Sequence, residues 1–381
     1  MRNFYLPFSF FIICLSLNAQ NLTEKIDQYL LQMQQKEGLN GVVLVAKDGE
    51  VLYQKAFGVR DNISKNTLKT DAPFYLGSIA KQFTTMGIML LKEQGKLAYE
   101  DPLSKFFPDY PTYANNITIR HLMTHTSGIK DQYNLGIYKK GLTNQEVYHS
   151  LIQQNLNFPP GERWQYSNGA YVLLAMIIEK VAGQPLPTFM EDSIFKPLDM
   201  DCAYVVHPKT KHPKHRAIGF SPSGVGDDQA MGNDYEIFTT GAGGIYANIN
   251  DLLKWDQALY TEKIVSQKTL QEAYQPAQLN DGSLTDYGFG WGIVKKDKVV
   301  GHTGSLNGFR NFIERDLENN ITLITLTNNT ATYRDALREG LRKVVQEQMP
   351  IAIKNATVIN VENGQTIDLS LIHISEPTRP Y

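Results

Sequence analysis

Cysteine is scarce in this chain of 381 residues, which contains only Cys14 and Cys202. Cys14 lies inside an apolar stretch near the N-terminus, so removal of that stretch would leave Cys202 alone. An intrachain disulfide is therefore excluded in the processed chain, even if its destination is oxidising. Long runs of one charge are also missing and the formal net charge is −2, which gives no support for nucleic-acid binding.

Several catalytic motifs are absent as well. No Gly-x-Ser-x-Gly sequence occurs, which argues against an α/β-hydrolase fold, and no phosphate-binding glycine loop occurs. His121 and His125 are four residues apart, but the glutamate of the zinc motif His-Glu-x-x-His is missing, so we expect both to be structural. His207, His212 and His215 lie among lysines and prolines, which favours a solvated loop over a metal site. We expect neither a metal nor a cofactor.

A long hydrophobic run is missing, but residues 1–19 have the pattern of a secretory signal. Arg2 supplies a positive start, residues 4–17 are mostly apolar, and Asn18-Ala19 offers a small-residue cleavage point. The apolar run is short for a membrane span, so we expect cleavage, with an uncleaved anchor as the alternative. The expected location is periplasmic or secreted.

The first chemical signal that is present is Ser78-Ile79-Ala80-Lys81, preceded by Gly77. Apolar residues spaced three or four apart predict a helix over residues 82–94, which Gly95 ends. Ser78 then lies at the helix start, and Lys81 lies one turn further on the same face. A lysine in this place can take the serine proton if burial lowers its pKa, and the free N–H groups of the helix start can stabilise an oxyanion.

Strand patterns gather at the two ends of the chain, whereas the middle is helical. The early strands are expected at residues 41–47 and 50–57, around an Asp48-Gly49 turn. The later strands are expected at residues 288–295, 298–302, 309–315 and 321–327, and the terminal helices at 22–36 and 331–348. We predict an α/β protein of the α+β type, whose antiparallel sheet is flanked by helices and built from both termini. A helical lobe of about residues 101–240 is inserted, and a site is expected between the lobes.

Two more motifs accompany the serine and the lysine. Tyr166-Ser167-Asn168 stands between a Pro-Gly break and a predicted helix, and His302-Thr303-Gly304 stands near the end of a predicted strand. In this order and spacing the three motifs resemble those of the serine β-lactamase and penicillin-binding superfamily. The Tyr-x-Asn form points to its class C-like branch. The resemblance covers about residues 22–348 and includes the phrase at residues 121–128.

The resemblance implies a role for each motif residue. Ser78 is expected to be the nucleophile that forms an acyl-enzyme. Lys81 and Tyr166 are expected to share the proton transfer, and which of them is the base stays open because coupled groups titrate as a unit. Asn168 is expected to orient Lys81 and the substrate amide. The ordinary alternative for Tyr166 and Asn168 is a packed tyrosine and a helix-capping asparagine.

The third motif departs from part of the superfamily. The resemblance implies that His302, Thr303 and Gly304 form one wall of the cleft and that the Ser305 N–H shares the oxyanion hole with that of the serine nucleophile. Many β-lactamases and DD-peptidases carry lysine where this chain has His302, which charges only below about pH 6.5. Carboxylate recognition should then be weaker and pH-dependent. Arg310 offers a replacement charge, although a surface arginine is the simpler interpretation.

The expected function is therefore that of a serine hydrolase that cleaves an amide or ester. A peptidase or esterase, such as a D-aminopeptidase or DD-peptidase, is favoured over a β-lactamase proper. The contrasting hypothesis is a non-catalytic protein that binds peptidoglycan peptides or β-lactams. The expected partner is a small-molecule or peptide substrate, peptidoglycan-derived peptides included, with no nucleic acid and no membrane span after signal cleavage.

The end of the chain differs in character from the rest. The hydrolase domain is expected over residues 20–350, and residues 351–368 form an extension or the start of a truncated further domain. Residues 369–381 resemble a translated sequencing adapter. We expect this segment to be an artefact and the natural chain to diverge at about residue 369.

Overall fold

A computed structural model describes residues 8–221, 237–294, 298–306, 308–347, 351–359 and 366–374. Parts of the predicted signal segment, of the helical lobe and of the adapter-like tail lie outside the described residues, at positions 1–7, 222–236 and 375–381. The chain divides into two compact units. The larger one comprises residues 32–335, and the other combines the two ends, residues 1–31 and 336–381.

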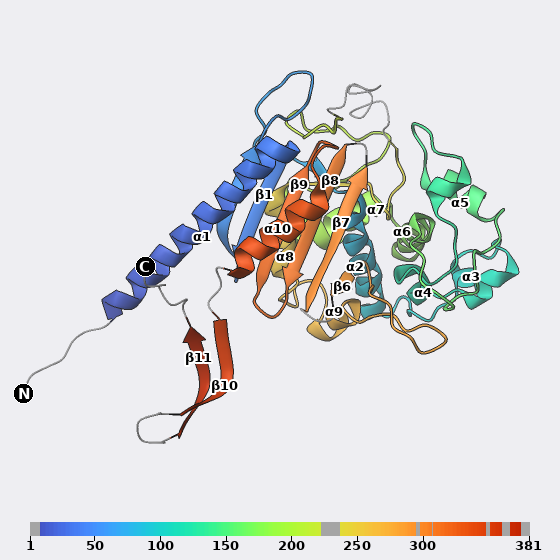
Figure 1. The fold of residues 1–381 in the computed structure, drawn as a ribbon. Coiled ribbons are helices and arrows are strands. Elements are labelled where there is room, and N and C mark those ends of the chain that lie inside the picture. The colour runs from blue at the N-terminus through green and yellow to red at the C-terminus, as the bar shows by residue number, and fades with distance from the viewer. Residues whose placement is uncertain are drawn as a thin grey trace, which may run out of the picture. The chain divides into compact units, whose positions relative to one another are not determined.

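A six-stranded antiparallel sheet is the frame of the larger unit (Figure 1). Its order is β2-β1-β9-β8-β7-β6, so early strands pair with late ones. The strands are β1 (Gly41–Lys47), β2 (Glu50–Phe57), β6 (Gly292–Val294), β7 (Val299–Leu306), β8 (Phe309–Asp316) and β9 (Ile321–Thr327). Along the β1–β9 pair, Gly41 faces Thr327 and Lys47 faces Ile321. The predicted sheet, built from both ends of the chain, is confirmed.

Two strand boundaries differ from the prediction. β7 continues four residues past the predicted end at His302, so the third motif lies within the strand. β6 is shorter than predicted and begins at Gly292, because Gly290 takes a φ of 74° that a strand does not allow. The first hairpin turn is as predicted: Asp48 and Gly49 both have positive φ, at 51° and 83°, as two-residue hairpins require.

Three helices of the larger unit pack beside this sheet (Figure 1). They are α2 (Ala80–Glu93), α8 (Ile249–Ala258) and α9 (Gln267–Ala273). α8 contacts β9 and β1, and it begins with the predicted cap, since the Asn248 side chain accepts from the Asp251 N–H. The rings of Phe83 and Trp255 stack 4.3 Å apart and join α2 to α8. This packing buries α2 almost completely.

The middle of the chain is helical, as predicted. Its helices are α3 (Leu103–Phe106), α4 (Ile119–Met123), α5 (Asn144–Leu151), α6 (Asn168–Ala182), α7 (Leu186–Met190), a π-helical turn at Glu191–Phe195 and short 3-10 turns at Thr112–Asn116, Gln132–Leu135 and Lys196–Leu198. α6 is the central one and contacts α2, α4 and α5. The Ser167 side chain caps its start and Gly183, with a φ of 70°, ends it. Asn168 is therefore the first residue of a buried helix.

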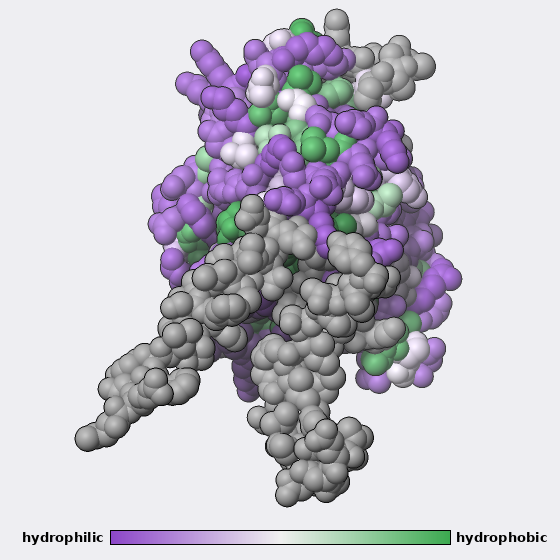
Figure 2. Space-filling view, turned by 60° about the vertical axis from the view of Figure 1, so that its left-hand side comes forward, coloured by the Kyte–Doolittle hydropathy of each residue, from purple (hydrophilic) through white to green (hydrophobic). Residues whose placement is uncertain are grey.

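A second, smaller sheet joins three short strands from distant parts of the chain. It consists of β3 (Phe74–Tyr75), β5 (Ile245–Ala247) and β4 (Tyr204–Val205), in the order β3-β5-β4. On the face that Figure 2 shows, the coloured surface is mainly hydrophilic and hydrophobic residues form small separate groups. Scattered apolar residues of this kind are ordinary on a protein surface.

The unit formed by the chain ends contains most of α1 (Phe8–Glu37) and α10 (Arg334–Glu347), together with β10 (Ile351–Ile359) and β11 (Thr366–Ile374). The Tyr29 hydroxyl donates to the Ala336 carbonyl at 2.9 Å, which ties the two helices together. β10 and β11 pair antiparallel. Among the described residues, no single helix is long and apolar enough to cross a membrane, although α6 with residues 186–198, bent by 78°, has the length and composition.

Candidate active site

Ser78 lies on a single 3-10 turn, Gly77–Ile79, that leads directly into α2. The turn touches β7 backbone to backbone. A Cβ on Gly77 would lie 2.7 Å from the Ser305 nitrogen, and a Cβ on Gly304 would lie 1.9 Å from the Leu76 carbonyl oxygen and 3.3 Å from the Ser78 nitrogen. Only glycine fits at these two points. The close approach brings the N–H groups of Ser78 and Ser305 to one gap, where an oxyanion could bind.

Lys81 lies one turn beyond Ser78 and is fully buried, with 0 % of its surface exposed. Its Nζ contacts Ser78 Oγ at 3.1 Å, Asn168 Oδ1 at 2.8 Å and the Ala242 carbonyl oxygen at 2.9 Å. Burial lowers the pKa of Lys81 to about 7, although the charge of Asp131 opposes this shift. A substantial share of the amine is therefore neutral near pH 7.

The three partners of Lys81 decide where its lone pair points. Asn168 Oδ1 and the Ala242 carbonyl can only accept hydrogen bonds, whereas the Ser78 hydroxyl can also donate. A neutral amine keeps two N–H groups, which the two obligate acceptors take. The lone pair is then left facing the hydroxyl hydrogen of Ser78, which is the arrangement that a general base requires.

Tyr166 lies against the same amine. Lys81 Nζ is 4.8 Å from the centre of the Tyr166 ring, and the Tyr166 hydroxyl is hydrogen-bonded to Ser78. Burial raises the pKa of Tyr166, and this outweighs the opposite effect of the hydrogen bond with Ser78. The phenol thus stays protonated near neutral pH and is suited to pass a proton rather than to remove one as a phenolate. The structure brings the three residues Ser78, Lys81 and Tyr166 together.

His302 lies on β7, and both of its ring nitrogens are engaged. Nδ1 is 2.6 Å from the Thr303 carbonyl oxygen, which can only accept, so Nδ1 carries the hydrogen. Nε2 then accepts from the Tyr287 hydroxyl at 2.8 Å. Burial, together with the charge of Lys81, lowers the pKa of His302 to about 3. This corrects the expectation of a charge below pH 6.5: the ring is neutral throughout the physiological range.

A cationic group nevertheless lies at this end of the cleft. Arg334 donates from Nη1 to the Ser305 hydroxyl at 2.8 Å, and its side chain is 20 % exposed. Arg310, which faces Ser305 across the β7–β8 ladder, is half-buried, and burial together with the charge of Arg334 lowers its pKa. Sequence reasoning considered Arg310 and missed Arg334, because nothing in the sequence indicates that a residue near the start of the last predicted helix reaches Ser305.

Asp131 is the other residue that the sequence did not indicate. Its Oδ2 accepts from both the backbone N–H and the side-chain Nδ2 of Asn168, each at 2.8 Å. Asn168 thereby presents Oδ1 to Lys81, as the expected orienting role requires. Asp131 comes three residues after Thr126-Ser127-Gly128, so the only sequence signal was its place just beyond a phrase that the resemblance already covered.

Aromatic rings enclose the far side of Tyr166. His125 lies 4.2 Å from the Tyr166 ring and 4.8 Å from the Tyr287 ring, measured between centroids, and its Nδ1 accepts from the Ser167 N–H. Burial holds the pKa of His125 well below its usual value. His121 instead accepts at Nδ1 from the Thr118 N–H in a capping box. Each histidine has a structural partner, as the sequence analysis expected. No cluster of three metal-ligating side chains occurs in the described part of the chain.

The structure contains two cavities that are candidates for a binding site, one of them at this constellation. One, of about 130 Å³, is lined by Ser78, Asn168 and Ser305 together with Tyr75, Gly77, Gln132, Tyr133, Thr239, Ala242, Gly243 and Leu306. It opens directly on the nucleophile and fits the role of a substrate cleft. Because Tyr133 and Leu306 border it, part of the wall is apolar.

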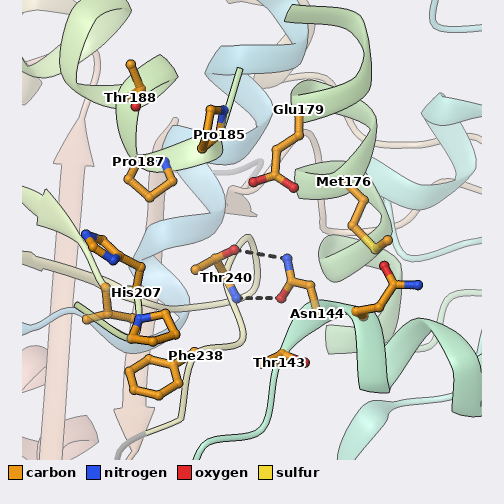
Figure 3. A pocket seen from close by; sticks show the side chains of 13 residues that line it. Thr143, Asn144, Met176, Glu179, Pro185, Pro187, Thr188, His207, Phe238 and Thr240 are labelled. Carbon is orange, nitrogen blue, oxygen red and sulfur yellow. Dashed lines mark hydrogen bonds between the residues drawn. The ribbon is translucent and has the colours of Figure 1, made fainter. Parts of the chain in front are cut away.

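The second cavity is larger, about 510 Å³, but lies away from the reacting groups. It is lined by residues of α5, α6 and α7, and the carboxylate of Glu179 points into it (Figure 3). Two hydrogen bonds between Asn144 and Thr240, at 3.0 and 2.8 Å, close the side near Thr239, which lines the substrate cleft. By size alone, this larger cavity would be chosen as the substrate site. The position of Ser78 identifies the smaller cavity as the substrate site instead.

A serine paired with a buried lysine and a tyrosine beside a small cleft is the arrangement of serine hydrolases that use a lysine-assisted nucleophile. The family model for Beta-lactamase matches residues 26–346 of the chain. The chain therefore belongs to the Beta-lactamase family, whose members include serine hydrolases. The motifs had predicted a resemblance over about residues 22–348, and the match covers nearly the same range.

Particular relatives show how varied the family is. Penicillin-binding protein 4* of Bacillus subtilis is 35 % identical over 349 residues, which are 86 % of this chain and 76 % of that protein. Esterase EstB of Burkholderia gladioli is 28 % identical over 82 % of this chain and 92 % of its own. D-amino acid amidase of Ochrobactrum anthropi, solved with D-phenylalanine, has a TM-score of 0.70 at 25 % identity, covering 87 % of this chain and 97 % of that one. The chain is similar to all three.

Proposed function

We propose that this protein is a serine hydrolase that cleaves an amide or ester through an acyl-enzyme on Ser78, as a peptidase or esterase rather than a dedicated β-lactamase. The observation that carries the proposal is the contact of Ser78 Oγ with the buried Lys81 Nζ at 3.1 Å, together with the lowered pKa of that amine, about 7. A nucleophile and a base within hydrogen-bond reach are the minimum for acyl transfer.

Acylation follows from the contacts. Neutral Lys81 takes the hydroxyl proton as Ser78 Oγ attacks the substrate carbonyl carbon, and the oxyanion binds the N–H groups of Ser78 and Ser305. Protonated Tyr166, hydrogen-bonded to Ser78, gives a proton to the leaving amine or alkoxide and receives one from Lys81. The same groups, used in reverse, activate a water molecule that releases the acyl group.

The neutral state of His302 supports the choice of peptidase or esterase. A group whose two nitrogens are engaged by Thr303 and Tyr287 cannot serve as the permanent cation that a lysine provides at this place. A substrate carboxylate, where one exists, would instead face Arg334 beside Ser305. Short peptides with a D-residue and simple esters are the substrate classes that this cleft suits. If residues 1–19 direct export, the enzyme meets peptidoglycan-derived peptides outside the cytoplasm.

The test is to label the protein with a fluorophosphonate probe and then to measure turnover of D-amino-acid amides, short-chain esters and a chromogenic cephalosporin. We expect labelling that Ser78→Ala abolishes and that the exposed turn variant Ser283→Ala retains. We expect ester or amide turnover to exceed cephalosporin turnover. The rate constant kcat/KM should rise with pH through about 7 as Lys81 loses its proton, by about tenfold between pH 6 and 8 for one titrating group.

Other outcomes assign other functions. Stable acylation of Ser78 without release would favour the binding protein, and cephalosporin turnover above that of esters and amides would favour a β-lactamase. Absence of labelling in a folded wild-type protein, with a normal circular dichroism spectrum, would refute the proposal.

A further inference from the structure

Asp131 occupies a junction between the helical region and the catalytic lysine. It precedes the 3-10 turn Gln132–Leu135, and its two carboxylate oxygens have different tasks. Oδ1 accepts from the Tyr133 N–H at 2.8 Å, which caps this turn. Oδ2 accepts from the Asn168 backbone N–H and from Asn168 Nδ2, each at 2.8 Å. A single oxygen thus holds both the start of α6 and the first side chain of that helix.

The contact with Asp131 decides which end of the Asn168 amide faces Lys81. An amide has a donating and an accepting end, and Asp131 can accept only. With Nδ2 on Asp131, Oδ1 faces Lys81 Nζ at 2.8 Å. In the reversed amide, two oxygens would face each other at Asp131, and N–H groups would face the Lys81 ammonium. Both contacts are repulsive when Lys81 carries its proton, so the carboxylate fixes the amide through Coulomb forces and not only through packing.

Asp131 is also the one anion among the groups that surround the ammonium in the described part of the chain. The other groups facing or influencing Lys81 are neutral: the Ser78 hydroxyl, the Asn168 amide, the Ala242 carbonyl, the rings of Tyr166 and Tyr171, and the imidazoles of His125 and His302. The carboxylate does not contact the amine, but it favours the protonated form against the larger effect of burial.

We propose that Asp131 is a positioning residue of the active site, which acts through Asn168: it fixes the amide so that Oδ1 faces Lys81 and supplies the negative charge that this buried amine faces. Without the carboxylate, the Asn168 amide can turn, Lys81 loses an acceptor, and its lone pair is no longer directed at Ser78. The inference deepens the proposed function and rests on it for its kinetic part only.

The competing explanation is that Asp131 merely caps the turn after it. Asp281 offers a matched control, because its Oδ1 accepts from the Ser283 N–H, two residues on, at 2.9 Å in an exposed turn away from the cleft. Asp131→Asn and Asp131→Ala are therefore compared with Asp281→Asn and Asp281→Ala. Thermal unfolding of the Asp281 variants gives the cost of losing such a turn cap, against which the Asp131 variants are compared.

The kinetic arm is a double-mutant cycle with Asn168→Ala. We expect Asp131→Ala to lower kcat/KM for the best substrate by about tenfold to a hundredfold, mainly in kcat, since a charge-assisted hydrogen bond to a reacting group is lost. In the Asn168→Ala background the same substitution should cost less than about twofold, because its target is gone. The acid limb of the pH profile should move to lower pH in Asp131→Asn, since the carboxylate raises the pKa of Lys81. The Asp281 variants should keep wild-type kinetics.

A second arm does not need activity. Titration of the Lys81 ammonium by NMR on protein labelled with carbon-13 in its lysine side chains, assigned with Lys81→Arg, reports its pKa directly. We expect a lower pKa in Asp131→Asn and an unchanged one in Asp281→Asn. Independent effects of Asp131→Ala and Asn168→Ala, with an unmoved Lys81 titration, would overturn the inference. Absence of any Ser78 chemistry in the wild type would refute the proposed function, while the titration would still test the role of Asp131.

Discussion

Arg315 and Lys81 are two almost completely buried cations of the larger unit, and they lie in chemically opposite surroundings. Arg315 on β8 has a side chain that is 1 % exposed, and its Nε donates to Asp256 Oδ1 on α8 at 2.5 Å. Lys81 on α2 is equally buried, but among the described residues no carboxylate contacts its amine. Burial alone would lower the pKa of either group. Around Arg315, nearby Tyr274 and Asp256 reverse the sign and raise the pKa, whereas for Lys81 burial prevails and the pKa falls to about 7.

The difference shows what separates a structural cation from a base. A buried charge is tolerated when a counter-charge and further hydrogen bonds satisfy it, and Asp256 receives both, since Thr322 Oγ1 also donates to it at 2.7 Å. A buried amine with only neutral acceptors gives up its proton easily. Arg315 therefore stabilises the packing of α8 against the sheet, whereas Lys81 can take a proton from Ser78.

The largest effect should come from Lys81→Arg, which keeps a charge but removes the possibility of a neutral amine. Guanidinium does not lose its proton in proteins, so the base is lost although the charge remains. We expect kcat/KM to fall by about 10²- to 10⁴-fold, the usual range for a general base. The variant Lys81→Met should lower kcat/KM by the same factor. The measurement is the second-order rate of Ser78 labelling together with substrate turnover.

Lys254→Arg is the control for that experiment. Lys254 is an exposed residue of α8 whose ion pair is with Asp201, and it does not line the cleft. It should retain wild-type rates. A Lys81→Arg variant that kept more than about a tenth of the activity would show that another group is the base, and Tyr166 would then be the next candidate.

The second effect concerns stability. Arg315→Met leaves the carboxylate of Asp256 buried without its partner, and we expect a loss of about 3–5 kcal/mol in the free energy of unfolding, measured by urea denaturation. The double variant Arg315→Met with Asp256→Leu should recover much of this loss, because no uncompensated charge remains. If the double variant is as unstable as the single one, the two side chains stabilise the fold by their packing and not by the pairing of their charges.

The motifs and the sheet were accessible from the sequence because both depend on local spacing. Ser78 and Lys81 are one helical turn apart, and Asp48-Gly49 dictates its own hairpin, so each pattern contains its geometry. The ends of strands were harder to predict. β7 extends to Leu306 because Leu306 pairs with Phe309 of β8, and the sequence around the motif does not indicate this pairing.

The electrostatic properties of the site were not accessible, because they depend on neighbours that are distant in the chain. The neutrality of His302 follows from burial and from the charge of Lys81, which is 221 residues before it in the chain. The orientation of Asn168 follows from Asp131, thirty-seven residues before it. A sequence pattern predicts which groups are present, and only the fold decides which protonation state each one prefers.

The smallest effect is expected for a third cation, Arg334. Its side chain is 20 % exposed, which is more than Arg315 and Lys81 but less than a fully solvated residue. Its guanidinium reaches Ser305, so it can attract a carboxylate at that end of the cleft. Solvent screens such a contact, and we expect Arg334→Ala to raise KM for a substrate with a free carboxylate by about three- to fivefold, with kcat little changed. Neutral esters should be unaffected, and Arg334→Lys should restore part of the affinity in low salt. An equal loss for charged and neutral substrates would mean that Arg334 only supports the Ser305 strand, and Lys81 would then be the one of these three cations with a role in the chemistry.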